Sequence, residues 1–196
     1  MRLSSRILNR IRARGPGSVF SATSFLDVAS RATVDQTLLR LDKRGLIRRV
    51  SRGLYDYPRV SQRLGVLSPR IDAIVKALDN KYGPLQISPA NAANMLGLTT
   101  QVPAKNVYLT NGSTRQLDIG GQEIILKHTG HRNLVWAGTP VGDVFQALRF
   151  LGPSGVDDVA KRALQNKLDL NDKAELRKHK ARAPIWIQSI ITEIAA

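Results

Sequence analysis

The fold is shaped first by the stretch RATVDQTLLRLDKRGLIRRVSRGLYDYP, residues 31–58. Its first half carries apolar residues at helical spacing, which predicts a helix over roughly residues 31–44 with one buried face. The buried positions would be Val34, Leu38 and Leu41. Gly45 is placed to end the helix. The sequence allows two starts for this helix, about one turn apart. Ser30 can act as the N-cap, and Thr33 with Gln36 can equally form a capping box.

A basic β-hairpin is predicted directly after this helix. Residues 46–50 and 54–57 have the composition of two strands, and Ser51-Arg52-Gly53 joins them. Gly53 lacks a Cβ and can take the positive φ that such a turn needs. The stretch therefore predicts a helix followed at once by a hairpin.

Three shorter elements are expected before the stretch. An amphipathic helix opens the chain, with Leu3, Ile7 and Ile11 on one face and a ridge of Arg2, Arg6 and Arg10 on another. Residues 15–17 are Gly-Pro-Gly and end this helix, and residues 18–20 would form a short strand. A short second helix is predicted from Ser24, with Asp27 reaching back to complete the cap.

Helix, short helix, helix and basic hairpin in this order are typical of a winged helix-turn-helix, in which the third helix enters the major groove of DNA. The candidate phosphate contacts are Arg2, Arg6, Arg10, Arg48 and Arg49. The candidate base contacts are Arg31, Thr33, Gln36, Thr37 and Arg40, and Arg44 and Arg52 complete the set of DNA-binding candidates. A basic helix face is often only a solvated face, and the hairpin alone could be an ordinary structural turn. Their consecutive occurrence favours nucleic-acid binding.

Charge supports this interpretation. Thirty Lys and Arg against fifteen Asp and Glu give the 196-residue chain a net charge of +15, which draws a protein to polyanions. Residues 1–63 hold 14 of the basic and only 4 of the acidic residues. The absence of cysteine excludes a disulfide scaffold and cysteine-ligated metals, and it fits a reducing, cytoplasmic location. No apolar run approaches the roughly 20 residues needed to cross a bilayer, so no membrane partner is expected.

Two segments also carry a family resemblance. KRGLIRRVSRGLYDYP, residues 43–58, resembles the link from recognition helix to wing in the AbiEi family of antitoxins, and the preceding FLDVASRATVDQTLLRLDKRG is similar to that family's helix pair. QVPAKNVYLTNG, residues 101–112, resembles the segment by which these proteins enter a β-hairpin. The resemblance implies a winged helix-turn-helix followed by a larger antitoxin domain. It also implies repression of the protein's own promoter and neutralisation of a nucleotidyltransferase toxin, in a type IV toxin–antitoxin system.

We expect an α+β chain in two domains: the winged helix-turn-helix over residues 1–60, a linker over residues 61–68, and a larger α+β domain over residues 69–196. Proline, glycine and serine interrupt the pattern near the linker. In the second domain we expect helices over 69–81 and 89–96, begun by Ser-Pro pairs, and an antiparallel meander of residues 107–110, 115–119 and 123–128. Four C-terminal helices should follow, over residues 141–151, 156–168, 171–180 and 184–194.

No catalytic constellation is found. His128 and His131 lie three apart without a third ligand, which is too sparse for a metal site. Asp157 and Asp158 stand at a predicted helix start, where capping explains them. No nucleophile elbow, P-loop or dinucleotide fingerprint occurs. We therefore expect no enzyme and no cofactor.

The leading hypothesis is an antitoxin that binds its own operator as duplex DNA and counteracts a companion nucleotidyltransferase toxin. The alternative is a basic interaction module that clamps a toxin or its RNA substrate without specific operator binding. A nuclease is the weakest hypothesis.

Overall fold

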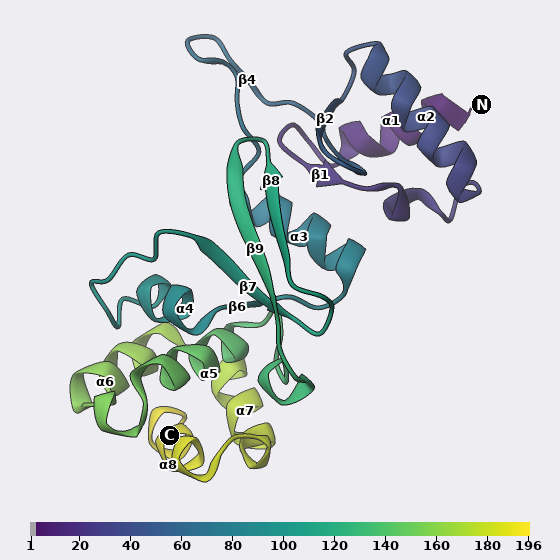
Figure 1. Ribbon diagram of the computed structural model, residues 1–196. Coiled ribbons are helices and arrows are strands. Elements are labelled where there is room, and N and C mark those ends of the chain that lie inside the picture. The colour runs from purple at the N-terminus through teal and green to yellow at the C-terminus, as the bar shows by residue number, and fades with distance from the viewer. Residues whose placement is uncertain (1–2) are drawn as a thin grey trace. The chain divides into compact units, whose positions relative to one another are not determined.

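The computed structural model describes residues 3–196 and shows a mixed α+β protein with small sheets and C-terminal helices, as predicted (Figure 1). The chain divides into two compact units. Unit 1 holds the residues up to Gly83 together with Leu117–Glu123, and unit 2 holds Pro84–Gln116 and Ile124–Ala196. No helix among residues 3–196 has the length and apolar character to span a membrane.

Unit 1 carries its elements in the predicted order. It begins with α1 (Leu3–Ala13), β1 (Val19–Phe20), the 3-10 helix η1 (Ala22–Phe25) and α2 (Arg31–Lys43). The hairpin β2 (Arg48–Ser51) and β3 (Leu54–Asp56) follows, then a second hairpin of β4 (Val60–Ser61) and β5 (Gly65–Val66), and finally α3 (Ile71–Tyr82). The first sheet has the order β1-β3-β2 with antiparallel pairing. Gly53 has a φ of 71°, as its turn requires.

The core of unit 1 is where α1, α2 and the first sheet meet. Its fully buried large side chains include Ile7, Ile11, Phe20, Phe25 and Leu38. Val34, Leu38 and Leu41 of α2 are all buried, which confirms the predicted inner face of this helix. The other face of α2 is therefore left to solvent.

The predicted second helix is wrong, because the chain forms only η1 there. Phe25 is fully buried and packs edge-on against Phe20 with 5.7 Å between ring centroids, so a tight 3-10 turn inserts it into the core. The predicted capping partner of Ser24 is also occupied elsewhere. Both carboxylate oxygens of Asp27 accept hydrogen bonds from Arg10, at 2.7 and 2.6 Å.

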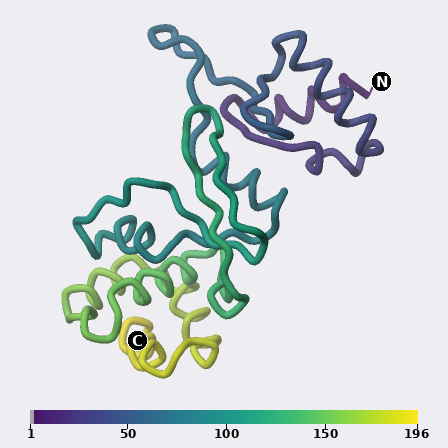
Figure 2. Tube along the Cα trace, viewed as in Figure 1, coloured from purple at the N-terminus to yellow at the C-terminus, as the bar shows by residue number. Residues whose placement is uncertain are grey.

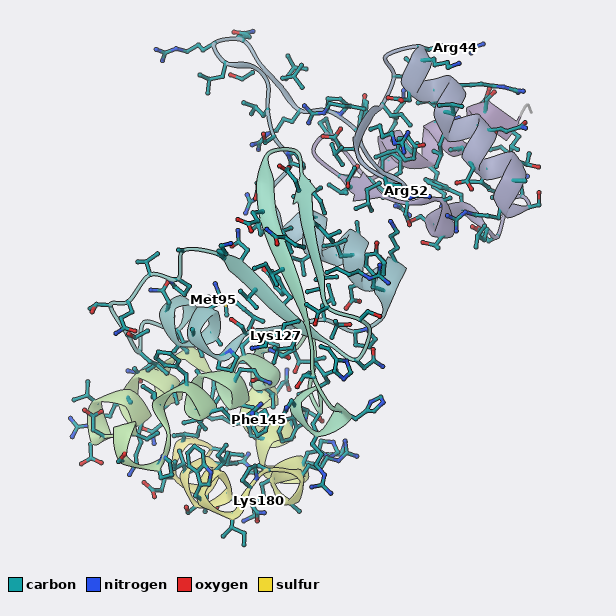
Figure 3. The ribbon with its side chains drawn as sticks, viewed as in Figure 1. Arg44, Arg52, Met95, Lys127, Phe145 and Lys180 are labelled. Carbon is teal, nitrogen blue, oxygen red and sulfur yellow. The ribbon has the colours of Figure 1, made fainter. Side chains whose placement is uncertain are left out.

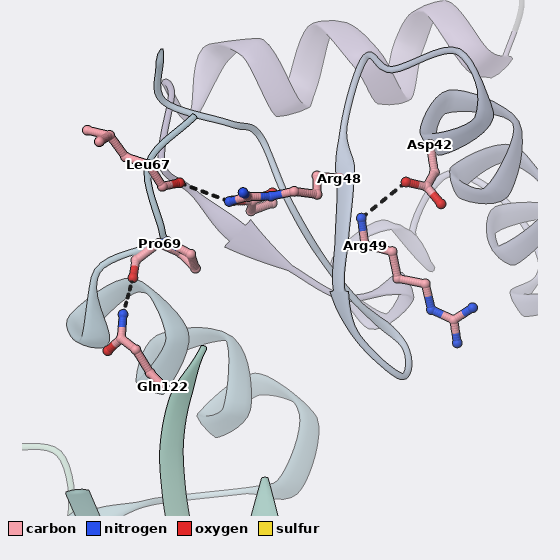
Figure 4. Close-up of polar contacts among 7 residues, drawn as sticks. Asp42, Arg48, Arg49, Leu67, Pro69 and Gln122 are labelled. Atoms are coloured by element: carbon pink, nitrogen blue, oxygen red, sulfur yellow. Dashed lines mark hydrogen bonds and ion pairs between the residues drawn. The ribbon is translucent and has the colours of Figure 1, made fainter. Parts of the chain in front are cut away.

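The compact units do not divide at the predicted linker. Residues 60–66 form the hairpin of β4 and β5, and α3 packs against β1 and η1 within unit 1. α3 buries Ile74, Ala77 and Leu78, so it needs an apolar surface to cover. Pro69 does not begin α3 as predicted. Its carbonyl accepts a hydrogen bond of 2.5 Å from Gln122 Nε2 (Figure 4), and the helix starts two residues later.

Unit 2 combines a four-stranded sheet with helices. The sheet contains β6 (Gln86–Ile87), β7 (Asn106–Thr110), β8 (Arg115–Ile119) and β9 (Gln122–His128), and residues 117–123 at the tip of the β8–β9 hairpin belong to unit 1. The helices are α4 (Pro89–Met95), η2 (His131–Asn133), α5 (Pro140–Leu151), η3 (Pro153–Gly155), α6 (Asp158–Lys167), α7 (Leu170–His179), η4 (Lys180–Arg182) and α8 (Ile185–Ile194). Figure 2 shows the four long C-terminal helices gathered together.

The predicted meander is wrong in its strand order, which is β6-β7-β9-β8. β7 pairs with β9 in parallel, so β9 lies inside the sheet and β8 at its edge. Burial explains the order: Ile124 and Leu126 of β9 are fully buried, whereas β8 is polar and mostly exposed, as edge strands tend to be.

The helix starts of unit 2 follow the sequence closely. The hydroxyl of Ser88 caps α4, and the carboxylate of Asp157 caps α6 by accepting from the Ala160 N–H at 2.8 Å. The four C-terminal helices lie within two residues of their predicted starts and bury an aliphatic core around Trp136 and Phe145.

Candidate nucleic-acid interface

The exposed face of α2 presents most of the predicted base contacts. Arg31, Thr33, Gln36 and Arg40 are all exposed, and Arg44 is exposed where the helix ends. Arg31 forms an ion pair with Asp35, at 2.9 Å between Nε and Oδ2. Figure 3 shows Arg44 extending from the end of α2. Thr33, Gln36, Arg40 and Arg44 therefore offer hydroxyl, amide and guanidinium groups along one accessible side, whereas Arg31 lies about half a turn around the helix from Arg40.

Thr37 does not belong to this face. Thr37 is only 6% exposed, and its hydroxyl donates to the Thr33 carbonyl at 2.8 Å. A hydroxyl that faces the core and bonds to the preceding turn is unavailable to a base edge. We therefore remove Thr37 from the predicted contacts.

The β2–β3 hairpin is held beside α2 by a specific contact. The backbone N–H of Arg49 donates to Asp42 Oδ1 at 3.1 Å, which ties the first strand of the hairpin to the last turn of α2 (Figure 4). The Arg49 side chain remains exposed. Arg52 lies at the hairpin tip, where its carbonyl accepts from Lys81 Nζ at 2.9 Å. No sequence pattern indicated the roles of Asp42 and Lys81, because both depend on contacts between separate elements.

Arg48 has an internal role instead of the predicted phosphate contact. Its Nη2 lies 2.5 Å from Asp56 Oδ2, and its Nε donates to Asp56 Oδ1 at 3.1 Å. Nη2 also donates to the Leu67 carbonyl at 2.9 Å (Figure 4). The Asp56 side chain is fully buried, and its hydrogen bonds raise the pKa of the Arg48 guanidinium. The pair therefore neutralises a charge within the sheet.

The predicted arginine ridge of α1 is divided among several roles. Arg2 lies outside the described residues. Arg6 is exposed, whereas Arg10 is paired with Asp27 and lies 5.7 Å from the centre of the Phe25 ring. The hydrogen bond from Arg10 lowers the pKa of Asp27. Arg6 thus makes no ion pair within residues 3–196, although its charge also lowers the pKa of Asp27.

The titratable side chains singled out in unit 2 make internal contacts. His128 Nδ1 lies 2.9 Å from the Gly112 carbonyl, and no three His, Asp or Glu side chains among residues 3–196 are grouped to hold a metal ion. Asp143 accepts a hydrogen bond of 2.9 Å from Gln86 Nε2. Burial raises the pKa of Asp143, and the Gln86 hydrogen bond opposes this shift. The contact between Gln86 and Asp143 connects β6 to α5 and pairs one oxygen of this half-buried carboxyl group.

The fold and this exposed basic face describe a small, two-unit α+β protein. A comparison with protein families identifies the family: the chain belongs to DUF6088, a family of unknown function, whose model it matches over residues 6–176. No curated protein matches the chain.

Proposed function

We propose that unit 1 is a winged helix-turn-helix that binds duplex DNA. α2 would enter the major groove and the β2–β3 hairpin would contact the neighbouring backbone. The observation that carries this proposal is the division of α2 into two faces, with Val34, Leu38 and Leu41 buried and a polar, basic face accessible. The element order and the β1-β3-β2 sheet agree with such a domain.

Affinity and specificity are assigned to different side chains in this proposal. Gln36 can pair with an adenine edge through two hydrogen bonds, and Arg40 can bind a guanine edge. Arg6, Arg49 and Arg52 contact phosphates, which carry no sequence information. The contact between Asp42 and the Arg49 N–H supports this division, since it fixes the spacing between reading helix and wing.

We further propose that the protein is a cytoplasmic antitoxin and transcriptional autorepressor. The support is the resemblance of residues 43–58 and 101–112 to the AbiEi family. In this proposal unit 1 represses the operon, and the chain counteracts a companion nucleotidyltransferase toxin. The first test is growth: expression of a nucleotidyltransferase encoded beside this gene should arrest cells, and co-expression of this chain should restore growth. Continued arrest would contradict the antitoxin assignment.

DNA binding is tested with two labelled duplexes, the region upstream of the gene and a shuffled sequence of equal composition. Gln36→Ala should lower the affinity for the upstream duplex by about 5- to 150-fold, since one base contact is worth about 1–3 kcal/mol. It should change the affinity for the shuffled duplex little. Arg49→Ala should weaken both equally. Gln101→Ala, an exposed glutamine of unit 2, is the matched control.

Two outcomes would contradict this reading scheme. Equal losses on both duplexes would remove Gln36 from the base contacts. Failure of the wild-type protein to bind either duplex at moderate salt would favour the basic interaction module instead. A steep fall of log affinity with log salt, about 0.9 for each phosphate contacted, is the expected signature of DNA binding.

A further inference from the structure

A second hairpin extends from unit 1 beyond the wing, and we call residues 59–67 the arm. Figure 1 shows it as a narrow two-stranded projection at β4. Val60 pairs with Val66 and Ser61 with Gly65. Arg59 and Arg63 are exposed, and the arm contains no acidic residue.

The base of the arm is anchored to the wing. The Leu67 N–H donates to the Arg59 carbonyl at 2.9 Å and closes the arm at its base. The Leu67 carbonyl in turn accepts from Arg48, the residue that is paired with buried Asp56. The direction in which the arm leaves the sheet is therefore fixed by the same ion pair that holds the wing strands.

The tip of the arm has a defined turn and an apolar surface. Ser61 Oγ accepts from the N–H groups of Arg63 and Leu64, both at 3.3 Å. Leu64 is 77% exposed, and Val60 and Val66 on the strands are 69% and 54% exposed. An isolated two-stranded hairpin is marginally stable, and it leaves these apolar side chains in water. A binding partner that covers them would remove that cost.

We propose that the arm is a second DNA-contacting element, with Arg59 and Arg63 on phosphates and Leu64 inserted in the minor groove. This rests on the proposed DNA binding by unit 1. Two-stranded ribbons bind DNA in the major or the minor groove, and leucine is among the side chains that wedge between base steps in the minor groove. Anchorage to the wing makes the arm continuous with the proposed interface.

Charge and size favour DNA over a second copy of the chain. Each chain carries +15, so the basic arm of one copy is repelled by the other and attracted to a polyanion. A stable protein interface also buries about 800 Å² on each partner, over about 20–30 residues. Nine residues with three exposed apolar side chains fall short of this, whereas a groove contact needs only a few.

The test measures the affinity of the full chain for the upstream duplex over a range of salt concentrations. Arg59→Gln/Arg63→Gln should reduce the slope of log affinity against log salt by about 1.8, which is about 0.9 for each lost phosphate contact. The matched control is Arg132→Gln/Arg182→Gln, which removes two exposed arginines of unit 2 and should leave the slope unchanged. Circular dichroism confirms that each variant is folded.

Leu64→Ser tests the wedge separately. It should lower affinity without changing the salt slope, and it should reduce the bend of a duplex labelled at both ends, measured by energy transfer, since an inserted side chain kinks DNA by about 20–90°.

The outcomes separate the two proposals. Absence of salt-dependent binding by the wild-type chain would refute the proposed function itself. Normal wild-type binding, with an unchanged slope in the double arginine variant, would overturn the arm inference alone. A dimer in sedimentation velocity that Leu64→Ser converts to monomer, with unaltered DNA binding and bending, would also overturn it and assign the arm to a second copy.

Discussion

The ion pair between Arg48 and Asp56 offers the sharpest test of the structure. Arg48→Met keeps an apolar stem of similar bulk but removes the guanidinium. It leaves the Asp56 carboxylate, whose side chain is 0% exposed, without its charged partner. The Leu67 carbonyl loses its hydrogen bond in the same step. Both losses act on the sheet that contains the β2–β3 hairpin.

The magnitude follows from the burial of the two partners. Breaking a buried pair from one side costs about 3–5 kcal/mol, because a charge remains buried without compensation. The Arg48 side chain is 35% exposed, so water screens part of the interaction. We therefore expect Arg48→Met to lower the free energy of unfolding by about 3 kcal/mol, at the low end of that range. Asp56→Asn should cost less, since the guanidinium left behind can reach water.

The assay is urea unfolding followed by far-ultraviolet circular dichroism. Arg49→Met is the matched control, because it removes the neighbouring, exposed guanidinium of the same strand and should change stability by less than about 0.5 kcal/mol. The double variant Arg48→Met/Asp56→Leu should recover much of the loss, because it buries no charge. If Arg48→Met is as stable as Arg49→Met and loses DNA affinity instead, Arg48 contacts phosphate and our assignment is wrong.

Three further changes test unit 2. Gly142→Ala should destabilise it by about 3 kcal/mol in thermal unfolding, the upper end of the range typical of overpacking, since a Cβ there would overlap the backbone carbonyl of Trp136. Asp143→Asn should stabilise the protein at pH 7 in urea titrations. Burial raises the pKa of Asp143 above its ordinary value of 3.8. The native wild-type protein therefore loses stability as pH rises from 3.8 through the raised pKa, where the carboxyl group ionises. The stability gained by Asp143→Asn should vanish below pH 3.8, where the carboxyl group is protonated in both states. Asp157→Ala should cost about 1 kcal/mol, because it removes the cap on the Ala160 N–H.

Two of these changes have a control in the same unit. Gly155→Ala should be tolerated, since its added Cβ would lie 3.4 Å from Leu151 Cβ, a distance that small movements accommodate. Asp158→Ala should cost less than Asp157→Ala, because the Asp158 side chain is 79% exposed and its ion pair with Lys161 is 3.6 Å long. An Asp143→Asn variant no more stable than wild type at pH 7 would show that the carboxylate is well solvated.

Local patterns in the sequence determined α2, the C-terminal helices and the turn of the β2–β3 hairpin. The buried face of α2 followed from apolar spacing, since residues three and four apart share one side of a helix. The caps of Ser88 and Asp157 and the turn at Gly53 act within three residues of their own positions. Such interactions involve residues close together in the sequence, so they can be predicted from the sequence alone.

Only the tertiary structure decided which arginines of the predicted interface face solvent. Arg48 and Arg49 are neighbours of the same type, yet one is paired with Asp56 and the other is exposed. Arg10 meets Asp27 across seventeen positions of sequence. A guanidinium binds whichever carboxylate folding brings within reach, and the spacing of charges along the chain does not encode that distance.

The same reason applies to the strand order and to the extent of unit 1. β9 lies between β7 and β8 because burying Ile124 and Leu126 outweighs the simpler path of a meander. α3 joins the elements before it because its apolar face fits β1 and η1. Apolar burial is non-directional and sums over many contacts. Which apolar face of a helix or strand packs against which other face therefore depends on the whole folded chain.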